Sequence, residues 1–460
     1  MPEPMPVRSI RALVALVLMI SACAPTAPSE KTPAQQTELP PMMRFSATQV
    51  DRPRRSNIAM AQDFMDLSFR LESGRELPVF TRFETPIRVH VTGDAPPTAA
   101  QDLALVLERI RREAGIDIAR ATDGPAQLTI EFLPRRVMQR LVPRAACFVA
   151  PRVSSWAEYR RAGSAALDWT SLQTRERTAI FIPNDTAPQE IRDCLHEELA
   201  QAIGPLNDLY RLPDSVYNDD NIHAVLTGFD MLMLRATYAP ELHSGMTAPQ
   251  VAAQLPRLLG RLNPYGEGIG GGLSEPTPRA YVAALDVALG PGAAGPRRRA
   301  AIKRALAIAD QRGWRDNRTG FAWLALGRLS RGQDADAAAA AFAQSAAIYH
   351  ANPALALHAA HADMQLATFA LSEGRAEAVL SLTGSALPIA ARGENAALLS
   401  TLLMLRAEAL ELTGRASEAR LVRLDSLGWG RYGFSSDKAI RARLRSIAAL
   451  TPKNEKTRQP

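Results

Sequence analysis

The chain has 460 residues, of which 47% are hydrophobic and 22% charged, a composition typical of a folded protein and long enough for two or three domains. The formal net charge is +7, and part of this excess lies at the two ends of the chain. Basic runs such as Arg297 to Arg299 could contact nucleic acid, but the secretion signal described next excludes that partner and favours a solvated helix start or an anionic envelope surface.

Residues 1–22 have the features of a bacterial signal peptide. Arg8 and Arg11 precede an apolar run, Ala12 to Ile20, that is too short to span a membrane. The string from Ile20 to Cys23 then closely matches the lipobox of bacterial lipoproteins. We therefore expect Cys23 to be the lipidated first residue of the mature protein; the alternative is an ordinary secretory signal with an incidental cysteine.

The residues after Cys23 predict where the lipid holds the protein. An Asp at the next position is the inner-membrane retention signal of enterobacterial lipoproteins, and here that position is Ala24, which favours the outer membrane, facing the periplasm. Residues 23–43 are rich in Pro, Thr, Ser and Gln and have no apolar period. Such a segment buries too little surface to offset its ordering entropy, so we expect a flexible tether.

Residues 44–245 predict a first domain of α/β (α+β) class. Alternating or continuous apolar residues indicate four strands, at 87–91, 128–132, 147–153 and 178–183. Helical patterns occupy 57–71 and the segment that ends at Gly115. This order of elements predicts helices packed on a mixed sheet.

A long helix follows the last of these strands. We expect it to begin near Thr186, whose hydroxyl would cap the backbone while Gln189 reaches back to complete a capping box. Leu195 and Leu199 recur at helical spacing and predict the face that packs on the sheet. Gly204 is the expected end of the helix.

Apart from Cys23, the mature chain has two cysteines, Cys147 and Cys194. In an oxidising compartment the simplest expectation is one disulfide between them; the alternative is two buried free thiols. We do not expect this pair to bind metal, because no further Cys and no suitably spaced His completes a tetrahedral set.

Residues Glu197 to Asp208, EELAQAIGPLND, resemble the active-site helix of metzincin zinc proteases. The family pattern is His-Glu-x-x-His-x-x-Gly-x-x-His-Asp. This chain keeps three of its residues, Glu198, Gly204 and Asp208. The resemblance implies that Glu198 stands at the general-base position and that Gly204 allows the turn after the helix.

The three metal-ligand positions of that pattern are occupied by other residues, namely Glu197, Gln201 and Asn207. A carboxylate can coordinate zinc, but side-chain amides are weak zinc donors and suit harder cations better. We therefore expect no cofactor and no catalysis, with a zinc or calcium site as the alternatives. A register starting at His196 as His-Glu-x-x-His is disfavoured because Ala200 stands at its second His.

The resemblance extends beyond this helix. Metzincins have a Met-containing turn beneath the metal, and this chain has Asp214-Ser215-Val216-Tyr217 at the corresponding place. The last family helix commonly starts Leu-Ser/Thr-x-x-Asp, here Leu226 to Asp230. In all, the similarity covers roughly residues 87–242. The chain also resembles a group of proteobacterial predicted lipoproteins, with no assigned activity, whose signature is Cys-x-x-Glu-Glu-x-x-Gln-x-x-Gly-x-x-Asn-Asp.

The remainder of the chain divides into a connection, a helical domain and a tail. Residues 246–279 contain a Gly-rich run that we expect to be a flexible connection; a phosphate-binding loop is the weaker alternative, since no Lys-Ser/Thr pair follows. Residues 280–445 are Ala- and Leu-rich, and Gly332, Gly374 and Gly414 recur at intervals of 42 and 40 residues. Helix, Gly turn, helix at this period resembles tetratricopeptide repeats. Residues 446–460 form a basic tail.

These observations predict an envelope-anchored lipoprotein that acts by binding. A helical-repeat solenoid usually binds protein or peptide, so we expect an envelope protein or a cell-wall component as its partner. The alternative for this half is a plain helical domain that braces the first. For the whole chain, the alternative is a metallopeptidase or another hydrolase with atypical ligands and Glu198 as its general base.

Overall fold

The computed structural model describes residues 39–45, 52–121 and 124–452. The predicted signal peptide, the lipidation site Cys23 and most of the predicted tether therefore lie outside the described residues, as does the end of the basic tail. Within the described ranges, no helix is both long enough and apolar enough to cross a lipid bilayer.

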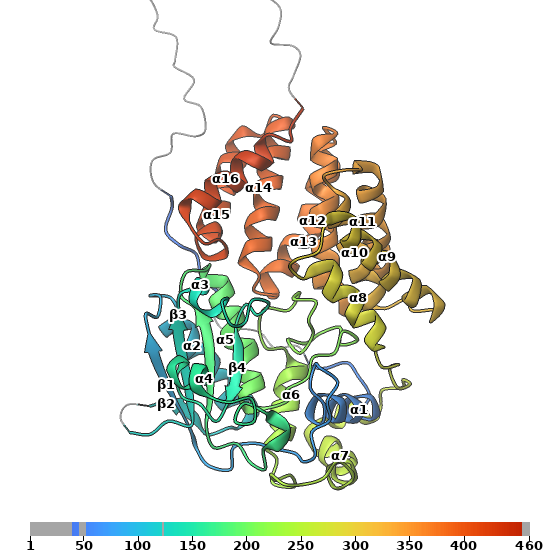
Figure 1. The fold of residues 1–460 in the computed structure, drawn as a ribbon. Helices are drawn as coiled ribbons and strands as arrows, with labels where there is room; N and C mark the ends of the chain where they lie inside the picture. Colours follow the sequence, from blue (N-terminus) through green and yellow to red (C-terminus); the bar gives the residue numbers. More distant parts are fainter. Residues whose placement is uncertain (1–38, 46–51, 122–123, 453–460) are drawn as a thin grey trace, which may run out of the picture. The chain divides into compact units, whose positions relative to one another are not determined.

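A mixed five-stranded sheet forms the centre of the first part of the chain, as the sequence predicts (Figure 1). Its strand order is β2-β1-β3-β5-β4, with β4 antiparallel and the other neighbours parallel. The strands are β1 Ile87–Gly93, β2 Ile118–Arg120, β3 Leu128–Leu133, β4 Phe148–Pro151 and β5 Thr178–Pro183. Only the three-residue edge strand β2 is absent from the prediction.

The two faces of the sheet carry different hydrophobic clusters. Ile180 and Ile182 of β5 belong to the large core that includes α2 and α5, whereas Phe181 packs with Met138 and Trp156 on the other face. Because alternate residues of a strand point to opposite faces, a strand covered on both sides is apolar throughout, and all six residues of β5 are buried.

Helices surround this sheet in the first part of the chain. They are α1 Asn57–Ser68, α2 Ala99–Arg109, α3 Arg135–Met138, α4 Trp156–Arg161, α5 Pro188–Ile203, α6 Gly228–Thr237 and α7 Ala248–Leu262. A π-helical turn, Ile110–Ala114, extends α2 to Gly115, which takes a left-handed φ of 71° and ends the helix as expected. Residues 246–279 were expected to form a flexible connection. The structure instead has the 15-residue helix α7 in the first half of this segment.

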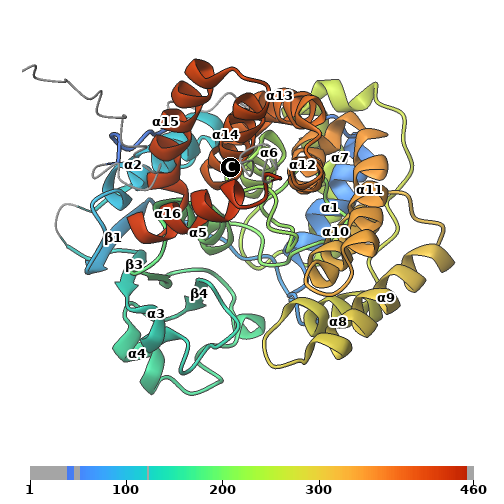
Figure 2. The same ribbon diagram turned by 90° about the horizontal axis from the view of Figure 1, so that it is seen from above.

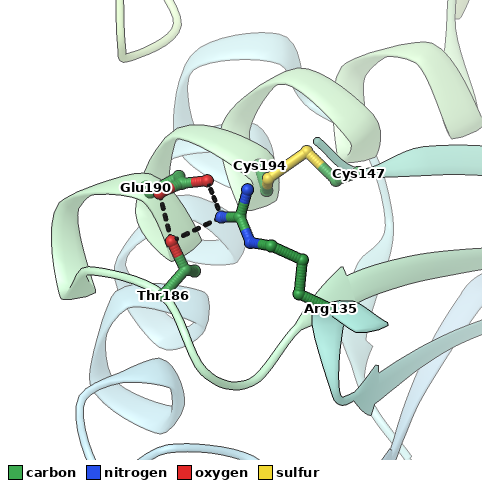
Figure 3. The surroundings of a disulfide bond; sticks show 5 residues. All are labelled: Arg135, Cys147, Thr186, Glu190 and Cys194. Atoms are coloured by element: carbon green, nitrogen blue, oxygen red, sulfur yellow. Dashed lines mark hydrogen bonds and ion pairs between the residues drawn. A yellow bond between two sulfur atoms is a disulfide. The ribbon is translucent and has the colours of Figure 1, made fainter. Parts of the chain in front are cut away.

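The start of α5 differs from the sequence expectation. The helix begins at Pro188, its N-cap is Ala187, and no side chain caps it. Thr186 instead hydrogen-bonds to Glu190, and Arg135 donates to both of these side chains (Figure 3). The predicted capping box is therefore wrong, because Gln189 is engaged elsewhere, as described below.

The predicted disulfide is present. Cys147, just before β4, is bonded to Cys194 of α5, with the two Cα atoms 6.0 Å apart (Figure 3). The bond joins the edge strand of the sheet to α5.

The second part of the chain is helical throughout. Its helices are α8 Arg279–Leu289, α9 Gly295–Gln311, α10 Asn317–Ser330, α11 Ala335–His350, α12 Ala356–Ser372, α13 Ala376–Arg392, α14 Ala396–Leu412, α15 Ala416–Gly433 and α16 Asp437–Ala448. Figure 2 views them from above. The recurring glycines each lie between the two helices of a pair, and Gly374 and Gly414 have φ values of 70° and 77°. Left-handed backbone of this kind favours glycine at these two positions.

Met43 and Phe45, at the boundary between the predicted tether and the first domain, contact this helical part. The backbone N–H of Met43 donates to the carbonyl of Gly428 in α15 at 3.0 Å, and the Phe45 ring stacks on Trp429 with centroids 4.4 Å apart. The end of the predicted tether is thus fixed on α15.

Candidate functional site

The three positions that correspond to metal ligands lie on α5 and on the loop that follows it. Two of their side chains make hydrogen bonds within the domain: Gln201 Nε2 donates to Asp208 Oδ2 at 3.0 Å, and Asn207 Nδ2 donates to the carbonyl of Asp66 at 2.9 Å. Glu197 is only partly buried, whereas Gln201 and Asn207 are buried. The amides therefore tie the loop to α5 and α1.

Carboxyl groups gather around Glu197. Burial, together with the nearby carboxylates of Asp219 and Glu72, raises the pKa of Glu197 to about 8. Burial also raises the pKa of Asp219 to about 7, with Glu72 as the next cause. Asp208 has its pKa raised well above its usual value, chiefly by burial and then by Asp219. We call these four acids, Glu72, Glu197, Asp208 and Asp219, the carboxyl cluster.

Glu198, at the general-base position, adjoins the carboxyl cluster. It is buried, its Oε2 has no hydrogen-bond partner among the described residues, and burial followed by the charge of Glu197 raises its pKa well above the usual range. A raised pKa favours the protonated carboxyl, which can donate a proton but cannot accept one as a general base does.

Gly204 allows the chain to turn tightly against α6. A Cβ at this position would lie 2.6 Å from Leu234 Cδ2, 2.9 Å from the Ala200 carbonyl oxygen and 3.2 Å from the Tyr217 hydroxyl. The need for glycine is thus steric, and the backbone at Gly204, with φ of −132°, is not left-handed. Tyr217, at the place of the family methionine, is fully buried beneath the helix end, and its hydroxyl has no partner among the described residues.

The Leu-Thr-x-x-Asp string at the start of α6 forms a capping box. Thr227 Oγ1 accepts from the N–H of Asp230, and the Asp230 carboxylate accepts from the N–H of Thr227 at 2.7 Å. The same carboxylate also accepts from the Ser215 hydroxyl at 2.5 Å and from the N–H of Val216 at 3.2 Å. Asp230 therefore fastens the turn that contains Tyr217 to α6.

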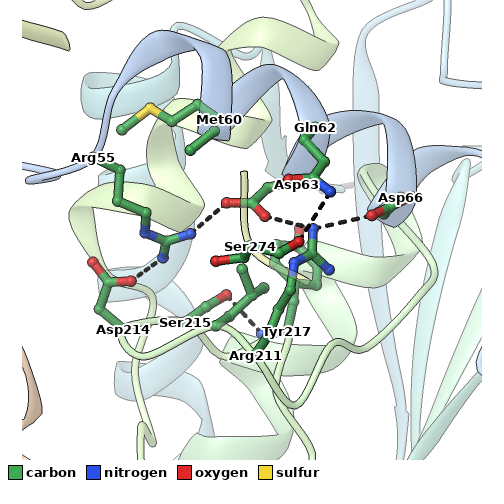
Figure 4. A network of polar contacts seen from close by, with 12 residues as sticks. Arg55, Met60, Gln62, Asp63, Asp66, Arg211, Asp214, Ser215, Tyr217 and Ser274 are labelled. Atoms are coloured by element: carbon green, nitrogen blue, oxygen red, sulfur yellow. Dashed lines mark hydrogen bonds and ion pairs between the residues drawn. The ribbon is translucent and has the colours of Figure 1, made fainter. Parts of the chain in front are cut away.

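Buried ion pairs connect the segment between α5 and α6 to α1 and to Arg55, which precedes α1 (Figure 4). Arg211 donates to Asp63 at 2.6 Å and to Asp66 at 3.1 Å, and both donor and Asp63 side chains are almost fully buried. Arg55 bridges Asp63 and Asp214. None of these pairs was foreseen, because Arg211 and Asp214 lie far in sequence from their partners and no local pattern joins Arg55 to Asp63.

The C-terminal end of α5 has a buried cation. Arg175 Nη1 donates to the carbonyls of Gln201 and Ala202, each at 2.8 Å. Burial lowers the pKa of Arg175 to about 10. A cation is favoured at the negative end of a helix, and here it takes up carbonyl groups that have no acceptor inside the helix.

The start of α5 is covered by the loop between α13 and α14. Arg192 forms a buried ion pair with Glu394, and Gln189 Oε1 accepts from the N–H of Ala396 at 2.7 Å. Glu394 has a backbone φ of 52°, which residues other than glycine rarely adopt. The helix that resembles a metal-binding helix thus serves as the docking point of the helical part.

His196 and His223 do not contribute a ligand set. His196 is buried, accepts a hydrogen bond from the N–H of Leu226 at 3.1 Å, and has its pKa lowered well below the usual value by burial and by Arg192. In the described part of the chain, no group of three or more His, Cys, Asp or Glu side chains is arranged to hold a metal ion. The ligand positions of the metzincin pattern are occupied by one carboxyl and two side-chain amides, Glu197, Gln201 and Asn207, and amides are weak donors to zinc.

Comparison with known proteins gives one match to a family model and no match with an assigned activity. Residues 57–257 match the model of a family described as a protein of unknown function, DUF2927. No curated protein and no solved structure matches the chain. The matched region contains α1, the carboxyl cluster, α6 and most of α7, but not Arg55 or the residues of the helical part that contact α5. It thus supports the resemblance to a domain of unknown function.

Proposed function

We propose that this protein is a lipid-anchored protein of the cell envelope that acts by binding and not by catalysis. In this proposal, the first part is a metzincin-like domain that has lost its metal site. The helical part is a tetratricopeptide-like repeat module that presents a surface to an envelope protein or a cell-wall component. The anchor is a lipid on Cys23 in the outer membrane, facing the periplasm.

One observation carries the non-catalytic part of the proposal. Both ends of α5 are committed to internal contacts, with Glu394 on Arg192 at one end and Arg175 on the last carbonyls at the other. Between them, Gln201 is hydrogen-bonded to Asp208, and burial raises the pKa of Asp208 and raises that of Glu197 to about 8. Zinc proteases need ionised or imidazole ligands and one open coordination position, which this arrangement of donors does not offer.

Elemental analysis of the mature protein, purified from the periplasm without chelators, tests this proposal. We expect less than a tenth of a zinc ion per chain and the same result for Glu197→Ala. Peptide hydrolysis should be undetectable and unchanged by Glu198→Gln, with or without added zinc. One zinc per chain that is lost in Glu197→Ala, or hydrolysis abolished by Glu198→Gln, would contradict the proposal and favour the hydrolase.

Metabolic labelling with a fatty acid tests the anchor separately. We expect the full-length protein to incorporate the label and to sediment with membranes, and the Cys23→Ser variant to do neither. Label in the wild type that persists in Cys23→Ser would show that the lipid is attached elsewhere. Unlabelled wild-type protein in the soluble periplasmic fraction would contradict the lipid anchor.

The binding part is tested by photo-crosslinking in cells. A photoreactive amino acid at Leu421 or Leu424, exposed apolar residues of α15, should give a discrete adduct with one envelope component. The same group at exposed Leu141, in the first part, provides the control. Identical patterns at both parts, or no adduct from any exposed position of the helical part, would contradict a specific binding surface there.

A further inference from the structure

A cavity of about 330 Å³ lies between the start of α6 and the helical part. Its walls come from the loop before α6, from the first residues of α12 and from the end of α13. Ligand pockets of roughly 300–1,000 Å³ occur preferentially where two parts of a protein meet. This cavity, which we call the interface pocket, is separate from the carboxyl cluster, since none of the cluster's residues lines it.

The interface pocket has an excess of positive charge. Arg52, Arg54 and Arg392 line it, and none of the three has a carboxylate partner among the described residues. The one acid in the lining, Asp214, already forms an ion pair with Arg55 (Figure 4). All three arginines are exposed to solvent, so the pocket opens to the surface with an excess of cationic side chains, which favours an anion as its ligand.

The backbone adds to this positive potential. The capping box at the start of α6 takes up the N–H groups of Thr227 and Asp230. Gly228 and Phe229, which line the pocket, have the other amides of that first turn, and amides in this position have no acceptor inside the helix. α12 also starts at the pocket, and no side chain caps it. Residues from the first turns of two helices therefore line one cavity, and the partial positive charge at a helix start favours an anion nearby.

The rest of the lining is apolar. Val225, Leu357 and Ile389 contribute to the wall, and the first two are buried. A wall of this kind contacts hydrocarbon and leaves a fully hydrated ion, such as free phosphate, without contacts on that side. The pocket therefore combines a positively charged end with a hydrophobic one.

We propose that the interface pocket binds a small organic anion. Arg54 and Arg392 hold its carboxylate or phosphate group at the start of α6, and its hydrocarbon part lies against Leu357 and Ile389. Guanidinium groups suit both oxyanions, because their paired N–H donors match two oxygens of either group. This inference goes beyond the proposed function, because it requires neither the lipid anchor nor a protein partner.

Calorimetric titration of the mature protein tests the proposal with three probes of equal chain length: hexanoate, monohexyl phosphate and the uncharged hexan-1-ol. We expect at least one anion to bind tenfold or more tightly than the alcohol at low salt. Hexanoate as the tighter probe would identify a carboxylate ligand, and hexyl phosphate a phosphate ester. Arg54→Gln and Arg392→Gln should each weaken the anion about tenfold, since hydrogen bonds to charged groups contribute roughly 1.5–3 kcal/mol.

Arg297→Gln is the matched control, because this exposed arginine of α9 lies outside the pocket and its loss changes the net charge equally. It should leave binding unchanged, and all three variants should melt within a few degrees of the wild type. Anions that bind no better than hexan-1-ol would overturn the proposal. So would an Arg297→Gln variant that loses as much affinity as Arg54→Gln, since the effect would then be one of net charge alone.

Discussion

The raised pKa values of Glu197 and Glu198 have a measurable consequence for stability. Burial raises both pKa values above those of the unfolded chain, that of Glu197 to about 8. Between about pH 4.5 and 8 the folded state therefore binds more protons than the unfolded state, so the free energy of unfolding falls as the pH rises. The slope for one such group is at most about 1.4 kcal/mol per pH unit.

We expect Glu198→Gln to flatten this slope and to raise the melting temperature at pH 8, because the amide cannot ionise. At pH 5, where the carboxyl is already neutral, the variant should melt close to the wild type. The measurement is thermal unfolding at half-unit intervals of pH. Glu176→Gln, at an exposed position, serves as the control and should leave the profile unchanged. A profile that Glu198→Gln leaves as steep as before would show that Glu198 is already ionised.

Gly204 provides a second test at this scale. We expect Gly204→Ala to destabilise the protein by about 1–3 kcal/mol, because the new methyl group would lie 2.9 Å from the backbone oxygen of Ala200, which cannot move without disturbing α5. Chemical denaturation measures the change. Gly163→Ala is the matched control, since a Cβ there meets nothing within 4 Å. Equal stability of the two variants would mean that the turn after α5 can relax.

The sequence predicted the identity of the residues in the candidate site better than their contacts. Cys147 and Cys194 are joined as expected, because the chain has only one other cysteine, Cys23, with which either could pair. The contacts of Gln189 could not be predicted, since its partner Ala396 lies 207 residues away and competes successfully with the local cap. The interaction of Asp219 with Glu197 was also missed, because no local sequence pattern joins the loop residue to the helix.

At the scale of elements, α5 connects the sheet to the helical part. Its buried Arg192 pairs with Glu394, which adopts a left-handed backbone conformation between α13 and α14. A strained residue of this kind persists only when its surroundings hold it, at a cost of roughly 1–3 kcal/mol. We infer that the ion pair and the hydrogen bonds of Gln189 supply that support.

A double-mutant cycle tests this pair. Arg192→Met should cost about 3–5 kcal/mol, because it leaves the Glu394 carboxylate buried without a cation, and Glu394→Gln should also destabilise the protein. The double variant Arg192→Met/Glu394→Gln should be more stable than the sum of the two losses implies, by 0.5–3 kcal/mol in the usual range for contacting residues. Strictly additive losses would show that the two side chains do not interact in solution.

Elements were predictable where the local pattern was strong. β1, β3 and β5 were expected from their apolar runs, whereas the three-residue β2 is too short to give a periodic signal. α7 was missed because Pro249 and Pro256 fall within it and a Gly-rich run follows. Pro249 occupies the first turn, where a missing N–H costs nothing, and a capping box of Thr247 and Gln250 starts the helix.

At the scale of the whole molecule, the contacts between the sheet-containing part and the helical part are buried and polar. Arg192 pairs with Glu394, His358 Nε2 lies 2.9 Å from Asp220 Oδ2, and Asn317 Nδ2 donates to the carbonyl of Tyr210 at 2.7 Å. The side chains of His358 and Asp220 are at most 1% exposed. Separating the two parts would leave such groups without their partners, and each loss costs on the order of 1–3 kcal/mol.

We therefore expect residues 39–452 to unfold in one cooperative transition and not as two independent domains. Differential scanning calorimetry should give a single peak whose van't Hoff and calorimetric enthalpies agree. A fragment ending at residue 279 should melt at a lower temperature than the intact protein, because Arg192, Asp220 and the Tyr210 carbonyl all lose their partners. The fragment with Arg192→Met should recover part of that loss, since it no longer has an unpaired buried cation. Two resolved peaks, the first matching the fragment, would show instead that each part is stable alone and that the contacts between them add little.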